Sequence, residues 1–156
     1  MIETSAADLR AALAVERWVT DVQSKSPFAS LEDLLSTAGA AAMPLAPVEI
    51  DEALSEHPRI GEKPVGAGAA QQFSRSEQAS ADADDAETNA LIADGNAEYE
   101  ALFGRVFLIR AAGRTRLEIL QELRRRLALP ADEELQIVGE QLRDIALLRL
   151  EKMYTS

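Results

Sequence analysis

The clearest indication of the fold class is the stretch Asp132–Met153, DEELQIVGEQLRDIALLRLEKM, near the end of the sequence. Its apolar residues recur every three to five positions, which places them on one face of an α-helix. These residues are Leu135, Val138, Leu142, Ile145, Leu148 and Met153. The charged residues Arg143, Asp144 and Glu151 fall on the other faces. The pattern predicts a long amphipathic helix that begins near Asp132.

The stretches before this helix show the same kind of pattern. Thr115-x-x-Glu118 has the spacing of a capping box, leucines follow at helical intervals, and Pro130 closes the element. Upstream, another helix carries Leu91, Ile92, Tyr99, Leu102 and Phe103, with Gly104 as its expected end. The short apolar run 106–109 between these two helices is predicted to be extended or irregular.

The first third of the chain is also predicted to be helical. A helix is expected from Ser5 to about Gln23, a second after the cap at Ser30, and a third from Pro47. The prolines and glycines of residues 57–68 predict a long loop. Because no segment shows the period-two alternation of a strand, we expect an all-α fold. Residues 1–156 should form a single-domain helical bundle of about seven to nine helices.

Composition excludes several classes of partner. The chain has 156 residues, 47% of them hydrophobic and 4% aromatic, and a formal net charge of -11. Such a negative surface repels nucleic acid and anionic membranes, so neither is an expected partner. There is no cysteine, no signal-like N-terminus and no apolar stretch of about 20 residues. These features predict a cytoplasmic protein.

His57 is the only histidine, so any imidazole acid or base must be this residue. A single histidine is more often structural than catalytic. However, His57 precedes a proline and a glycine-rich loop, and breaks of this kind often carry function. The position therefore makes His57 a candidate general acid or base.

Several other polar groups have competing interpretations. Glu77 follows Ser74 at capping-box spacing, which favours a helix cap, although a carboxylate at a helix end can also face a ligand. The acidic residues 82–87 are better explained as a solvated helix start than as a cation site. The three arginines 124–126 are better explained as an exposed helix face than as an anion site.

Other chemistries lack their characteristic residues. There is no nucleophile elbow, no phosphate-binding glycine loop of the Walker type and no histidine pair for zinc. We therefore expect no bound metal. The residues alone lead to a helical protein with a candidate His/Glu site and no identified substrate.

The run Glu56–Lys63, EHPRIGEK, resembles the loop typical of the 2-oxo-4-hydroxy-4-carboxy-5-ureidoimidazoline (OHCU) decarboxylases, a family of purine degradation. Further fragments follow in the order found in that family, and the resemblance extends from about Ala11 to Lys152. They are ERWV at 16–19, PFASL at 27–31, SEQA at 76–79, Asn96-Ala97-x-Tyr99, FGRVFLI at 103–109 and RRRL at 124–127.

The resemblance implies an all-α, cofactor-free homodimer that converts OHCU to S-allantoin and carbon dioxide. It implies that His57 is the catalytic acid/base and that Glu77 orients the ureido or ring amides of the substrate. The remaining implied substrate-binding residues are Pro58, Ser74, Arg75, Ser76, Gln78, Phe107, Leu108, Ile109, Arg110, Ala111 and Arg149. The sequence departs from many relatives at Arg110, where they have a small residue.

Two alternatives remain at this point. The chain could be a non-catalytic helical interaction domain, which would agree with its acidic surface and apolar helix faces. It could also be an enzyme that acts on a related ureide. Retention of both His57 and Glu77 argues against the interaction domain, because a binding protein needs neither for chemistry.

Overall fold

The computed structural model describes residues 1–55, 57 and 69–155, of which 69–72 by their main chain. Its eight helices confirm the all-α prediction, and the described residues form no strand beyond one isolated bridge between Ile2 and Phe28. The helices are α1 (Ala6–Ala12), α2 (Glu16–Gln23), α3 (Leu31–Ala41), α4 (Pro47–Leu54), α5 (Ala69–Glu77), α6 (Ala86–Phe103), α7 (Arg116–Leu127) and α8 (Ala131–Tyr154).

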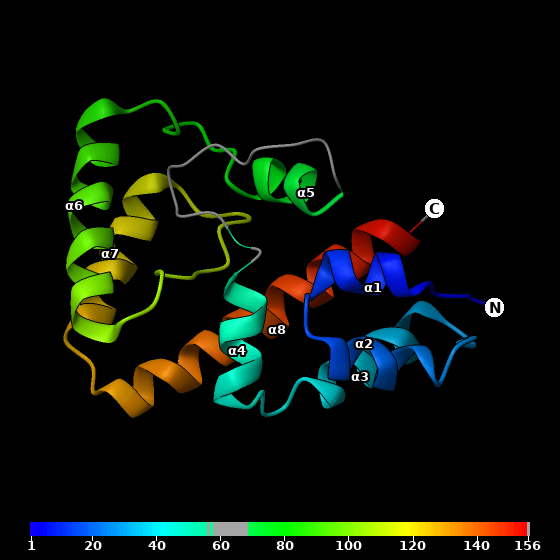
Figure 1. Cartoon of the computed structure of the whole chain (residues 1–156). Coiled ribbons are helices and arrows are strands. Elements are labelled where there is room, and N and C mark those ends of the chain that lie inside the picture. Colours follow the sequence, from blue (N-terminus) through cyan, green and yellow to red (C-terminus); the bar gives the residue numbers. More distant parts are fainter. Residues whose placement is uncertain (56, 58–68, 156) are drawn as a thin grey trace. The chain divides into compact units, whose positions relative to one another are not determined.

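The chain divides into two compact units. Figure 1 shows its helices, coloured along the sequence. The first unit comprises residues 1–56 and 139–156, and the second comprises residues 57–138. Helix α8 begins in the second unit and ends in the first. None of the helices in the described ranges is long and apolar enough to cross a membrane.

The first unit is organised around Trp18 of α2. Its side chain is completely buried, and its indole Nε1 donates a hydrogen bond to the carbonyl oxygen of Ala38 in α3, at 3.0 Å. This bond satisfies the one polar group of a large apolar side chain, as a buried tryptophan requires. Trp18 therefore ties α2 to α3.

The expected single helix from Ser5 to Gln23 is wrong, because the chain forms two helices there. Ser5 caps α1 as predicted, accepting a hydrogen bond from the N–H of Asp8. Leu13 and Val15 then have extended backbones and buried side chains. These two apolar residues are therefore buried in an extended connection between α1 and α2, and not on the face of one continuous helix.

The second unit has a core between α6 and α7, which lie side by side (Figure 1). Its buried cluster consists of Ile92, Tyr99, Phe107, Ile109, Ala111, Ile119, Leu120 and Leu123. The helices approach closely at Gly95, where an added Cβ would lie 2.5 Å from Leu123 Cδ2. Glycine at this position thus permits the contact between the helices.

The ends of α6 and α7 follow the predicted signals. Helix α6 ends at Gly104, whose φ of 72° is the left-handed conformation that glycine adopts without strain. Thr115 and Glu118 form the predicted capping box of α7. Residues 106–111 between these helices are neither helix nor strand, which agrees with the prediction for 106–109.

Candidate active site

His57 is the first residue of the second unit and follows the end of α4 after a short connection. Its side chain is half-buried, so the imidazole is accessible to a small molecule while it is partly shielded from water. The rest of the predicted loop, including Pro58, lies outside the described residues. The expected contribution of Pro58 therefore stays a prediction.

Glu77 belongs to the same unit and is the last residue of α5. The predicted helix cap is wrong, because Ser74 and Glu77 lie in the final turn of α5 and not at a helix start. The spacing of three residues still places both on one face of the helix. Ser74 is 5% exposed and Glu77 is 9% exposed, so this face is buried.

The neighbours of Glu77 differ in their exposure. Arg75 and Ser76 are exposed, whereas Gln78 is half-buried and its N–H donates to the carbonyl oxygen of Ser74 at 3.1 Å. A carboxylate and a hydroxyl that share a buried helix face form a polar surface suited to N–H donors. The substrate-binding roles expected for Ser74, Arg75, Ser76, Glu77 and Gln78 stay predictions.

The segment Phe107–Ala111 also belongs to the second unit. Phe107, Ile109 and Ala111 are members of its apolar core cluster, whereas Leu108 and Arg110 are not. This alternation is typical of an extended chain, whose successive side chains point to opposite sides. One side of the segment is thus anchored in the core between α6 and α7.

Two arginine side chains bind main-chain oxygens of this segment. Arg126 Nη1 donates to the carbonyl oxygen of Leu108 at 2.6 Å, and Arg114 Nε donates to that of Arg110 at 2.9 Å. The N–H groups of Ile109 and Ala111 take part in no main-chain hydrogen bond with another described residue. These donors suit a ligand that carries carbonyl or carboxylate oxygens.

Arg149 of α8 belongs to the first unit. It is 3% exposed, and its Nη1 donates to the carbonyl oxygen of Ala11 at 2.9 Å. The structure therefore gives Arg149 a contact with the end of α1. Its expected contact with the substrate stays a prediction.

The interpretation of arginines 124–126 as an exposed face is wrong for one of them. Arg124 and Arg125 are exposed, but Arg126 is completely buried. A signal for this was present, because residues 120, 123 and 126 are spaced by three and therefore share the apolar face of α7. Arg126 and its partner Glu134 are among the buried polar residues of this unit that sequence reasoning missed.

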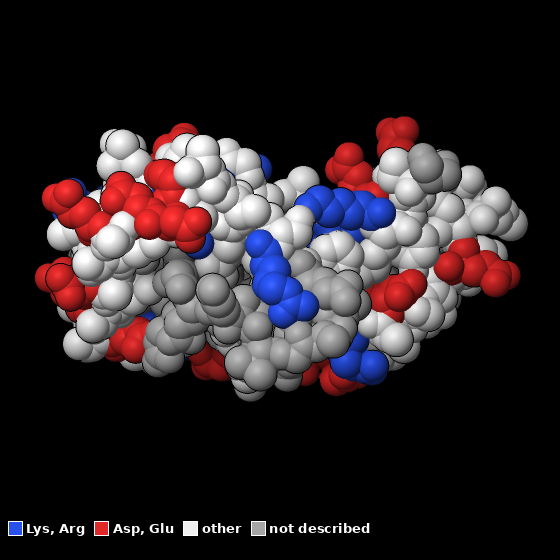
Figure 2. Space-filling view, turned by 90° about the horizontal axis from the view of Figure 1, so that it is seen from above, with Lys and Arg blue, Asp and Glu red and all other residues white. Residues whose placement is uncertain are grey.

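The acidic stretch before α6 supplies two helix caps, of which one is at the helix start that the sequence predicted and the other is at the start of α7. Asp85 caps α6, accepting from the N–H of Glu87. Asp82 accepts from the N–H groups of Arg116 and Leu117 at 2.7 and 3.1 Å. Figure 2 shows acidic side chains exposed at several separate places on the face it draws. Among the described residues, no group of His, Asp and Glu is arranged to hold a metal ion.

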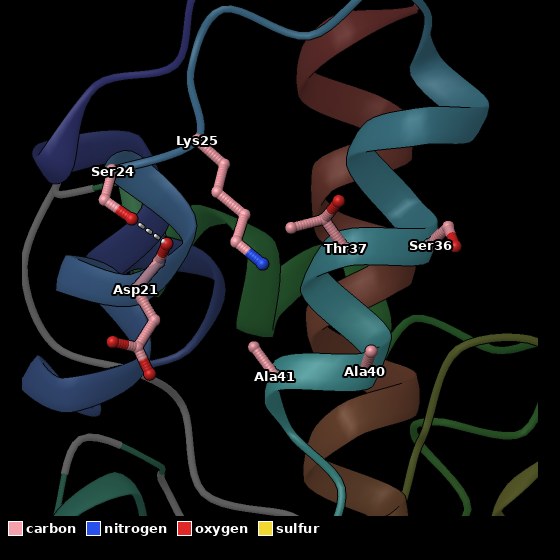
Figure 3. Close-up of a pocket in the computed structure, with 7 residues that line it drawn as sticks. All are labelled: Asp21, Ser24, Lys25, Ser36, Thr37, Ala40 and Ala41. Atoms are coloured by element: carbon pink, nitrogen blue, oxygen red, sulfur yellow. Dashed lines mark hydrogen bonds between the residues drawn. The ribbon is translucent and has the colours of Figure 1, made fainter.

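A groove in the first unit lies between α2 and α3 and has a volume of about 580 Å³ (Figure 3). Its lining comprises Asp21, Ser24, Lys25, Ser36, Thr37, Ala40 and Ala41. None of the predicted site residues is among them. The groove is therefore separate from the residues to which chemistry was assigned.

Solved structures share this fold. The chain matches the structure described as "Crystal structure of OHCU decarboxylase in the presence of (S)-allantoin" with a TM-score of 0.78 and 24% identity, over 96% of this chain and 99% of the other. It matches an (S)-allantoin synthase structure with a TM-score of 0.67 and 15% identity, over 94% of this chain and 48% of the other. At these identities the likeness concerns the fold.

Relatives by sequence point to the same class. A Homo sapiens protein named "Putative 2-oxo-4-hydroxy-4-carboxy-5-ureidoimidazoline decarboxylase" is 32% identical over 131 residues, which are 83% of this chain and 76% of that protein. The uric acid degradation bifunctional protein TTL of Arabidopsis thaliana is 36% identical over 109 residues, 67% of this chain. The match spans 33% of the length of that bifunctional protein.

A family model described as OHCU decarboxylase matches residues 2–151. Together with the human relative, this match covers nearly the whole chain. The chain therefore belongs to the OHCU decarboxylase family, a family of carboxy-lyases.

Proposed function

We propose that this protein decarboxylates OHCU to S-allantoin and carbon dioxide in urate breakdown, with His57 as acid/base and Glu77 orienting the substrate. The family match over residues 2–151 is the observation that carries the proposal. The described geometry supports it, because His57, the buried face of α5 and the segment 107–111 all belong to the second unit. The substrate class and the residue roles are parts of this one proposal.

The chemistry balances without an external electron acceptor. When the bond between C4 and the carboxylate breaks, carbon dioxide leaves and the electron pair forms a C4–C5 double bond. The electrons of the ring C=N move to its nitrogen, which takes up a proton. Loss of the 4-hydroxyl proton and addition of a proton at C5 then give the C4 carbonyl and the S centre of allantoin. The imidazoline itself is the electron sink.

His57 has the properties that the proton transfers require. An imidazole is the side chain whose ordinary pKa lies nearest neutrality, so it can both donate and accept a proton under working conditions. Its half-buried position lets it reach one face of a bound ring. Delivery of the proton to one face of C5 would account for a single product enantiomer.

Glu77 and the segment 107–111 are assigned to binding. A carboxylate accepts two N–H bonds at once, which matches the amide-rich edges of a ureido-imidazoline. The N–H groups of Ile109 and Ala111 would bind the oxygens of the same ligand. Groups that hold a substrate in one orientation lower the barrier by positioning it for reaction.

The proposal is tested by following the appearance of S-allantoin. Urate is converted in situ to OHCU by the two preceding enzymes, and circular dichroism records the chiral product with and without this protein. We expect the protein to accelerate formation of S-allantoin above the spontaneous reaction. A rate equal to that of the spontaneous reaction rules out the decarboxylase and leaves the related-ureide enzyme and the interaction domain.

We also propose a homodimer, which the family resemblance supports. The cytoplasmic location expected from the sequence stays a prediction.

A further inference from the structure

A buried polar cluster lies at the centre of the second unit and consists of Arg126 of α7, Glu134 of α8 and Tyr99 of α6. These three side chains are 0%, 1% and 1% exposed. Arg126 Nε donates to both carboxylate oxygens of Glu134, at 2.8 and 3.1 Å, and Arg126 Nη2 donates to Glu134 Oε1. The Tyr99 hydroxyl donates to the same carboxylate oxygen at 2.6 Å. The cluster thus joins three helices.

The protonation of this cluster is maintained by its surroundings. Burial, followed by the hydrogen bond to the carboxylate of Glu134, raises the pKa of the Tyr99 hydroxyl above its usual range. Tyr99 therefore remains a donor at any pH at which the protein works.

Arg126 also reaches beyond the helices to the segment assigned to the substrate. Its Nη1 donates to the carbonyl oxygen of Leu108 at 2.6 Å, and its guanidinium lies 4.7 Å from the centre of the Phe107 ring. The ring of Phe107 also contacts that of Tyr99, with centroids 5.2 Å apart. The guanidinium is thus held by Glu134 on one side and holds the main chain at Leu108 on the other.

The hydrogen bond to Leu108 has a directional consequence. The Leu108–Ile109 peptide bond is trans, because cis bonds occur only at Ser26–Pro27 and Met43–Pro44 in the described part of the chain. In a planar trans peptide, the carbonyl of one residue and the N–H of the next point in opposite directions. When Arg126 holds the Leu108 oxygen, the Ile109 N–H must point away from the buried cluster.

Stability alone gives a weak explanation for this arrangement. Removing two charges from water is costly, and buried ion pairs can often be replaced by apolar residues of similar volume without loss of stability. What apolar residues cannot supply is a donor to the Leu108 oxygen. The distinctive effect of the cluster is therefore on the orientation of the segment 107–109.

We propose that Arg126 is a positioning residue, which aims the Ile109 N–H at the substrate by holding the carbonyl of Leu108. This inference rests on the proposed function, which assigns the segment 107–111 to OHCU. Arg126 does not touch the substrate and takes no part in proton transfer. Glu134 and Tyr99 in turn fix the guanidinium.

The decisive variant replaces the whole cluster with apolar residues: Tyr99→Phe, Arg126→Met and Glu134→Leu together. Because no charge is left unpaired, we expect it to fold, as circular dichroism will show. We expect kcat/KM for OHCU to fall about tenfold or more, mainly through a higher KM, because an N–H donor to the substrate acts in binding. The pH profile of the remaining activity should be unchanged, since His57 is intact.

Two further variants sharpen the test. Arg126→Lys keeps the charge but lacks the fork that reaches Glu134 and Leu108 together, so its KM should lie between those of the wild type and the triple variant. Arg125→Met with Glu122→Leu removes the ion pair between an exposed arginine and a half-buried glutamate of the same helix and should leave KM unchanged. A structural role would lower the melting temperature without this ordering of KM values.

Backbone NMR order parameters provide a readout independent of activity. In the triple variant, the order parameters at Leu108 and Ile109 should fall, because the carbonyl of Leu108 is no longer held, while those in α6 should be unchanged. A folded triple variant with wild-type KM, or with wild-type order parameters at Leu108 and Ile109, overturns the inference and leaves the proposed function intact. A wild-type protein that does not accelerate OHCU decay overturns the proposed function, and this inference with it.

Discussion

His57 is the residue on which the proposed chemistry depends most directly. His57→Asn keeps a polar side chain but removes the imidazole. We expect kcat to fall by about 100-fold or more, the usual effect of losing a general acid or base. The S-allantoin assay measures this loss, and far-ultraviolet circular dichroism checks that the variant is folded. Near-normal turnover would remove His57 from the mechanism.

Glu77 should affect binding more than turnover. Glu77→Gln is nearly isosteric and keeps one acceptor oxygen, but it introduces an N–H₂ group toward the donors of the substrate. We expect KM to rise about tenfold with a smaller change in kcat, because the carboxylate acts on the substrate before and during reaction. Glu98→Gln, on an exposed position of α6, is the matched control. Equal KM values for the two variants would contradict the assignment.

The role of a residue was predictable from the sequence when its type is rare in the chain or when its neighbours in sequence are distinctive. His57 was identified because it is the only histidine, and its position beside a glycine-rich loop gave it a setting. Arg126 was missed because three consecutive arginines suggest a solvated surface. Its spacing from Leu120 and Leu123 indicates the apolar face of α7, but its partner Glu134, eight residues away in another helix, cannot be inferred from a local pattern.

Among the helices, the start of α7 is stabilised by a carboxylate from a distant part of the chain. The N–H groups of Arg116 and Leu117 donate to Asp82, and the Arg116 bond in particular holds the pKa of that carboxyl below its usual value. A carboxyl with a lowered pKa stabilises the folded state above its unfolded pKa of about 4. The stabilisation is lost as the pH falls through the lowered, folded-state pKa.

Asp82→Asn should therefore lower the free energy of unfolding at neutral pH and have a smaller effect in acid. Urea unfolding from about pH 7 to about pH 3 measures the difference from the wild type. Asp94→Asn, on an exposed position of α6, is the control and should show little effect at either end. A difference that grows toward low pH would contradict the assigned role of Asp82.

Close packing between α6 and α7 makes Gly95 sensitive to a single methyl group. Gly95→Ala gains about 1 kcal/mol of helix propensity but forces Leu123 to move, which typically costs about 1–3 kcal/mol. We expect net destabilisation, measured by urea unfolding. Gly139→Ala is the control, because its added Cβ would lie 3.6 Å from Ile50 Cδ1, an ordinary contact, and should be neutral or stabilising.

Testing Gly95→Ala in a Leu123→Val protein shows whether the contact with Leu123 causes the destabilisation. In Leu123→Val the methyl group that the new Cβ would meet is absent, so adding Gly95→Ala should become neutral or favourable. The difference between the two backgrounds measures the coupling of the two positions. Equal effects in both would show that the helix contact is not the cause.

That the segments are helical was easier to predict than where each helix begins and ends. Helices α3, α4, α6 and α7 begin at the expected signals, because each has a local cap or an N-terminal proline. The break between α1 and α2 was missed because Leu13 and Val15 continue the apolar pattern through it. The helix α5 was misplaced because the Ser74–Glu77 spacing of a cap also occurs in its last turn.

For the whole molecule, the proposed homodimer is the property to measure. Sedimentation equilibrium should give twice the chain mass of 16.9 kDa at concentrations near those of the assay. The formal charge of -11 makes nonspecific association unfavourable, so a stable dimer requires a specific interface. A mass of a single chain would contradict the dimer and leave the family membership unaffected. The prediction that residues 1–156 form one domain also awaits experiment.

The position of Trp18 determines what an optical experiment on this protein will detect. It is the only tryptophan in the chain, and it lies in the first unit, buried against α3. Its fluorescence emission will therefore follow exposure of that unit to water. A substitution at Glu77 or Arg126 could loosen the second unit while the emission spectrum stayed constant. Screens of such variants therefore need far-ultraviolet circular dichroism, which reports on the helices of both units. With fluorescence alone, a variant with a damaged second unit would be classified as intact.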